Sequence, residues 1–103
     1  MKEYNINITE DKKNKLVKIE LSGLLNIANI KEIKKEIDAV IKSNKSIELK
    51  IDNPEEADLS LMQLLIAIQK EQERIKTKIK INLELNKETL ELFSRAGFSE
   101  TFN

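Results

Sequence analysis

The sequence predicts one α/β domain over residues 1–103, a mixed four-stranded sheet with its helices on one face. Two observations predict this fold class. Apolar and polar residues alternate in four short stretches, which is the spacing of half-buried strands. In three other stretches apolar residues recur three and four positions apart, as in amphipathic helices. The elements follow the order β-β-α-β-α-β-α, and 103 residues with 40% hydrophobic content can bury one core.

The first two predicted strands form an antiparallel hairpin. Apolar side chains alternate over residues 3–9 and again over residues 17–22. The charged, turn-like residues 10–14 join the two stretches, and so short a connection favours a hairpin. Gly23 follows the second stretch. We expect this glycine to end the strand in a turn with positive φ.

A helix and a third strand come next. Apolar residues form one helical stripe over residues 30–41, and Asn26 or Asn29 can cap its start. Residues 47–52 alternate again, and Pro54 ends this strand because proline has no N–H to donate. A strand covered on both faces would be continuously apolar, whereas these strands keep one polar side. The helices are therefore expected to stack on one face and to leave the other open to water.

The second predicted helix follows an acidic loop at residues 55–57. Its apolar residues recur at helical spacing from Leu61 to Ile68, and the helix turns polar before Arg74. Residues 79–83 alternate as the fourth strand.

A third helix completes the predicted order. Asn86 is suited to cap its N-terminus, and Gly97 is suited to follow its C-terminus. Leu90, Phe93 and Ala96 are expected to face the core because they share one helical face.

The composition excludes several classes of function. The chain has no Cys and no His, which excludes thiolate nucleophiles, imidazole acid–base catalysis and the usual zinc sites. Two glycines cannot form a glycine-rich phosphate loop. Positive and negative residues balance at 18 each, so no nucleic-acid partner is expected. No long apolar run or secretory pattern occurs, so we expect a cytoplasmic, non-enzymatic protein without cofactor, metal or membrane insertion.

The candidate functional site is the entrance of the second helix. Unpaired backbone N–H groups at a helix entrance favour negative charge. Ser60 has two open interpretations: it forms a capping box with Gln63, or it presents an exposed hydroxyl for phosphorylation. Asp58 either caps the helix, or orients that hydroxyl for an incoming kinase or binds the magnesium of the kinase. An outward Leu59 or Met62 would anchor a partner. The candidate partner-binding residues are Asp58, Leu59, Ser60, Leu61, Met62, Gln63 and Asn26.

Three segments, in this order, resemble the STAS domain, the family of bacterial anti-sigma-factor antagonists that is also found in sulfate transporters. Residues 23–28, Gly-Leu-Leu-Asn-Ile-Ala, are similar to its Gly-x-Leu-Asp-Ile-x segment. Residues 58–65 resemble its Asp-x-Ser/Thr-x-x-Gln-Leu-Leu signature, and residues 92–98 resemble its Leu-x-x-x-Gly-Phe/Leu ending. Asn26 replaces the family's Asp, and Leu61 replaces the glycine usual in antagonists. These differences favour the STAS proteins of chemotaxis operons or lipid-transport systems.

The resemblance implies a phosphorylation-switched protein-binding module of a bacterial signalling relay. In this family a GHKL-type serine kinase, which is an anti-sigma factor or part of a sensory complex, phosphorylates the residue at the position of Ser60. A PP2C-type phosphatase resets it. An exposed Ser60 would let Ser60→Asp weaken partner binding with little change in melting temperature. The alternative is a STAS subunit that docks constitutively on the ATPase of a lipid-transport ABC system.

Overall fold

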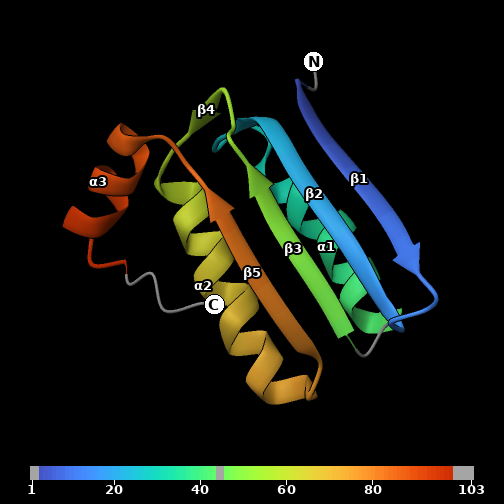
Figure 1. Ribbon diagram of the computed structural model, residues 1–103. Helices are drawn as coiled ribbons and strands as arrows, with labels where there is room; N and C mark the ends of the chain where they lie inside the picture. Colours follow the sequence, from blue (N-terminus) through green and yellow to red (C-terminus); the bar gives the residue numbers. More distant parts are fainter. Residues whose placement is uncertain (1–2, 44–45, 99–103) are drawn as a thin grey trace.

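The computed structural model describes residues 3–43 and 46–98 (Figure 1). Within them the chain is an α/β domain with a mixed sheet and three helices. Its elements in chain order are β1 (Tyr4–Asp11), β2 (Leu16–Leu25), α1 (Ile30–Ser43), β3 (Ser46–Asp52), β4 (Glu56–Ala57), α2 (Leu59–Ile75), β5 (Lys78–Glu84) and α3 (Lys87–Arg95).

The sheet has the strand order β1-β2-β3-β5, with β4 paired to the end of β2. β1 and β2 pair antiparallel, which confirms the predicted hairpin, whereas β2, β3 and β5 pair in parallel. β4 makes five strands instead of the predicted four, because Glu56–Ala57 in the expected acidic loop pairs with Leu24–Leu25. A strand of two residues has no alternation that the sequence could reveal.

Gly23 does not end β2 but lies inside it, opposite Tyr4. Its φ is +86°, so the expected positive φ is confirmed while the expected turn is wrong. A Cβ at this position would lie 2.5 Å from the carbonyl oxygen of Glu3, so only glycine fits. β2 pairs with β3 up to Leu21 and with β4 from Leu24 onward. The strand thus changes neighbours at this glycine.

α1 and α2 cover the same face of the sheet (Figure 1). Between this face and the helices lies the core, whose largest fully buried side chains are Phe93, Ile19, Leu21, Leu25, Ile33, Ile37, Leu49, Ile51, Leu61 and Leu65. The edge strand β1 is tied to α1 through the Tyr4 hydroxyl, which donates a hydrogen bond to Glu36 Oε2 at 2.6 Å. The apolar positions of the strands therefore face the helices, as their alternation predicts.

The opposite face of the sheet is polar. The parallel register places Glu48 of β3 between Lys18 of β2 and Lys80 of β5, and it pairs Glu20 with Lys50. On this face Lys50 of β3 forms an ion pair with Glu84 of β5, with Nζ and Oε1 3.7 Å apart. The balanced charge of the chain is thus partly arranged as a grid of alternating signs on this face.

α3 lies beside the carboxyl end of β5 (Figure 1). Asn86 accepts a hydrogen bond from the Thr89 backbone N–H at 2.8 Å, which confirms the predicted cap. Phe93 is buried and meets Phe98 edge-on, with ring centroids 5.4 Å apart. Ala96 is exposed, so its expected inward position is wrong: this residue is the C-cap that follows the last helical residue, Arg95.

Candidate functional site

The candidate site lies where the end of β2 meets the entrance of α2. Parallel pairing of Leu25 with Ala57 brings the turn after β2 beside the first turn of the helix. Asn26 reinforces this contact, because its Nδ2 donates a hydrogen bond to Glu56 Oε1 at 2.7 Å. Its own Oδ1 accepts from the Ala28 backbone N–H at 3.1 Å and so shapes the turn.

Asp58 is the N-cap of α2, as one interpretation of the sequence predicts. Its Oδ1 accepts hydrogen bonds from the Ser60 backbone N–H, at 2.9 Å, and from the Ser60 hydroxyl. Its Oδ2 accepts from the Ile27 backbone N–H at 2.9 Å. Asp58 therefore caps the helix and also binds the serine hydroxyl.

The electrostatics of Asp58 follow from these contacts. Burial alone would raise the pKa of its carboxyl group. Hydrogen bonds from the Ser60 hydroxyl and from backbone N–H groups, that of Ile27 first, outweigh burial and hold the pKa below its ordinary value of 3.8. The carboxylate is therefore ionised at neutral pH, and its negative charge is matched to the helix entrance.

Ser60 differs from both sequence-based expectations. It is the second residue of α2 and not the cap, so the predicted capping box with the exposed Gln63 does not form. Only 8% of Ser60 is exposed, because its hydroxyl turns back to Asp58 and the residue packs at the buried side of the helix. The expectation of an exposed hydroxyl is wrong.

The remaining predicted binding residues separate into two groups. Leu59 is 39% exposed, and Gln63 and Asn26 also reach solvent. Leu61 is fully buried and Met62 is 8% exposed, so these two belong to the core and offer no surface to a partner. They lie on the buried face of the helix, whereas Leu59, the first residue of α2, is exposed.

Sequence reasoning missed Ile27, which is 72% exposed. Four large hydrophobic residues are exposed within residues 3–43 and 46–98: Ile27, Leu59, Ile8 and Leu92. The first two are both next to Asp58, whose carboxylate binds the backbone N–H of Ile27 and which precedes Leu59 in the chain. An isoleucine in a turn between polar or small residues was the available signal. We call the surface formed by Asn26, Ile27, Glu56, Asp58 and Leu59 the α2 corner.

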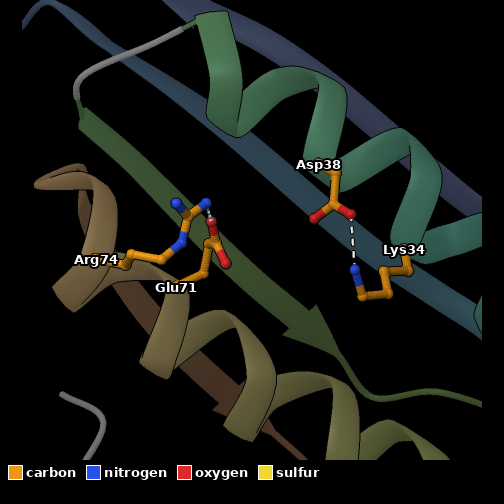
Figure 2. A network of polar contacts seen from close by, with 4 residues as sticks. All are labelled: Lys34, Asp38, Glu71 and Arg74. Atoms are coloured by element: carbon orange, nitrogen blue, oxygen red, sulfur yellow. Dashed lines mark hydrogen bonds and ion pairs between the residues drawn. The ribbon is translucent and has the colours of Figure 1, made fainter.

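A hollow of about 500 Å³ lies between α1 and the C-terminal part of α2. Figure 2 shows four of its charged residues: Lys34 pairs with Asp38 at 2.8 Å on α1, and Arg74 pairs with Glu71 on α2. Lys42 also lines the hollow. These side chains are exposed and each is paired within its own helix, so they stabilise little. These four charges are paired within their own helices, and we therefore place the candidate binding site at the α2 corner.

Within the described part of the chain, no group of acidic residues is arranged to hold a metal ion. The helices described here include none long and apolar enough to cross a membrane.

A scan against protein-family models gives no match, and a search of curated proteins gives no significantly similar sequence. The fold and the site define an α/β domain with a mixed sheet, whose candidate site is a helix entrance.

Proposed function

We propose that this chain is a STAS-like, non-enzymatic protein-binding module of a bacterial signalling relay, and that a partner serine kinase switches it at Ser60. One observation carries the proposal. The Asp58 carboxylate holds the Ser60 hydroxyl with one oxygen and the backbone of Ile27 with the other. A chemical change at Ser60 is thereby coupled to the most exposed apolar residue of the α2 corner.

The α2 corner has the composition of a docking surface. Ile27 and Leu59 supply exposed apolar area, and Asn26 and Glu56 border it with polar groups. Interfaces commonly combine an apolar centre with a polar rim. The acidic residues Glu56 and Asp58 favour a partner that brings basic side chains to the same place.

Phosphorylation would act on Asp58 first. The phosphate adds about −1.5 to −2 charges at Ser60 and replaces the hydroxyl proton that now bonds Asp58. The two anions repel, so Asp58 releases the Ile27 backbone N–H and the turn after β2 loses its anchor. The helix entrance itself tolerates the phosphate. The α2 corner would lose the shape that a partner of the unmodified state binds, and that partner would dissociate.

The burial of Ser60 sets a condition on this switch. A kinase can reach the hydroxyl only when the first turn of α2 opens, because 8% of the residue is exposed. For the same reason Ser60→Asp would place two carboxylates in contact. We therefore expect this variant to lose stability as well as partner affinity, unlike a variant at an exposed serine.

The test uses the GHKL-type serine kinase encoded nearest to this chain, with ATP, and intact mass followed by peptide mapping. We expect one phosphate on Ser60 in the wild type and none in Ser60→Ala. Ser94→Ala is the matched control, because Ser94 is an exposed serine on α3, and it should still be phosphorylated. Titration of the kinase should then give weaker binding to the phosphorylated form. A phosphate at another residue, or equal affinity of both forms, would refute the switch.

The same burial favours a second candidate function: constitutive docking on the ATPase of a lipid-transport ABC system. A hydroxyl held against Asp58 can simply brace the α2 corner without being modified. In this case the ATPase should bind wild type and protein treated with kinase and ATP alike, while Ile27→Lys weakens binding. Loss of ATPase binding after phosphorylation of Ser60 would reject this function in favour of the first.

A further inference from the structure

We infer that the outer edge of β1 is a pairing surface for a second copy of this chain, with the two β1 strands antiparallel about Asn7. This inference is independent of the proposed function. β1 is a terminal strand of the order β1-β2-β3-β5 and has β2 as its neighbour on one side. The argument depends on which backbone groups face outward, on the side chains that flank them, and on their symmetry.

The register identifies the outward backbone groups. The Leu24 backbone N–H donates to the carbonyl oxygen of Glu3 at 2.9 Å, and pairing continues without a break from Tyr4 to Asp11. Hydrogen-bonded pairs alternate along an antiparallel ladder. The odd-numbered residues therefore bond β2, and Ile6, Ile8 and Glu10 direct their N–H and C=O groups away from it. Such a row of groups is a template for another strand.

The two edges of the sheet differ in how they discourage pairing. β5, at the other edge, has Lys78 and Lys80, and lysine on an edge strand opposes the approach of a second sheet. β1 has no lysine, arginine, proline or glycine, and residues 4–9 are uncharged in a chain that is 35% charged. The β1 edge thus lacks the usual protection.

Apolar surface also remains beside this edge. Ile8 is 46% exposed, although its partner across the ladder, Ile19, is fully buried. The helices that cover β2 therefore do not extend over the end of β1 that contains Ile8. A strand added at this edge would cover that side chain, and burying apolar area is the main favourable term in association.

The residues of β1 match a second copy of β1 when the two strands pair about a two-fold axis. A two-fold axis through Asn7 sets the outward groups of Ile6 against those of Ile8 in the other chain, and the reverse. Both residues lie on the face of the ladder that contains Leu21 and Ile19, so their side chains also pair across the axis. One step beyond Tyr4, Glu3 would meet Asp11, and this like-charge pair ends the added ladder. Because both chains use the same edge, the pairing ends at a dimer and does not continue into a filament.

The test measures the mass of the full chain over a range of concentrations by sedimentation equilibrium. We expect a monomer–dimer equilibrium in the wild type. Asn7→Lys places two lysines on the axis and should weaken the dimer about tenfold or more. The matched control is Asn82→Lys, which makes the same change at an exposed position of β5 and should leave the equilibrium unchanged. Circular dichroism checks that both variants are folded.

Amide hydrogen exchange gives a second, site-resolved measurement. The Asn7 amide faces β2 and should stay protected at every concentration. The amides of Ile6 and Ile8 should be protected at high concentration and exchange rapidly on dilution. A chain that stays monomeric throughout, or a dimer that Asn7→Lys does not weaken, would overturn the inference.

Discussion

The carboxylate of Asp58 accepts a hydrogen bond from the backbone N–H of Ile27 at 2.9 Å, although 31 positions separate the two residues. The same side chain caps α2 and holds the Ser60 hydroxyl. The side chain that caps the helix therefore also makes the long-range hydrogen bond to Ile27. The turn after β2 and the entrance of α2 are linked because both bind this carboxylate.

Removing this carboxylate should destabilise the domain. We expect Asp58→Ala to lower the free energy of unfolding by about 1–2 kcal/mol, since the helix loses its cap and the Ser60 hydroxyl loses its acceptor. Urea unfolding measures the change. Asp38→Ala removes an exposed pair within one helix and should cost only about 0.3–0.5 kcal/mol. Equal losses in the two variants would contradict the bridging role of Asp58.

The acid stability of the chain should depend on Asp58. Its pKa in the folded state lies below the ordinary value of 3.8, so the folded state favours the ionised form. The resulting stabilisation is complete above pH 3.8 and is lost as the pH falls through the folded pKa. The stability advantage of wild type over Asp58→Asn should therefore shrink below pH 3.8 in urea titrations. If the stability difference between wild type and Asp58→Asn instead increased as the pH falls, the pKa of Asp58 would be raised and not lowered on folding.

Gly23 and Gly97 allow backbone strain to be separated from steric contact. Both have positive φ, +86° and +91°. A Cβ at Gly23 would lie 2.5 Å from the Glu3 carbonyl oxygen, whereas a Cβ at Gly97 would meet nothing within 4 Å. Gly97→Ala should cost about 1 kcal/mol of strain. Gly23→Ala should cost clearly more in thermal unfolding, because the β1–β2 ladder must also shift; comparable losses would mean that the ladder yields freely.

Tyr4 should make the domain sensitive to alkali. Burial first, and then the hydrogen bond to Glu36 and its negative charge, raise the pKa of Tyr4 to about 12 from an ordinary value of 10.0. A raised pKa means that this stabilisation is complete below pH 10.0 and is lost as the pH rises toward 12. The stability difference between wild type and Tyr4→Phe should therefore decrease over that interval. A difference independent of pH would argue against a buried, neutral phenol.

The sequence predicts most of the fold because its local signals agree with one another. Alternation locates β3 and β5, and Asn86 and Gly97 mark the two ends of α3 as expected. The missed elements depend on contacts between distant segments. β4 exists because β2 changes neighbours beyond Gly23, and no local pattern encodes that change.

The sequence predicts Asp58 at the entrance of α2, but not the contacts made there. Asp58 could be identified as a cap because its residue type and place before an apolar helix suffice. Whether Ser60 faces water depends on the partner of its hydroxyl. That hydroxyl donates to Asp58, and the residue is buried. The exposure of Ile27 depends on the turn that Asn26 and Asp58 hold in place. Hydrogen bonds between distant segments produce no periodic pattern of apolar residues, so the sequence does not reveal them.

The antiparallel course of β1 has a consequence for how many targets one assembly can hold. Tyr4, at the start of β1, lies opposite Gly23, near the end of β2 that leads into the α2 corner. Two chains joined along β1 would present their corners at opposite ends of a continuous sheet. Such a particle would be bivalent, and a target with repeated or clustered copies of the matching face would be retained by avidity far beyond the strength of one contact.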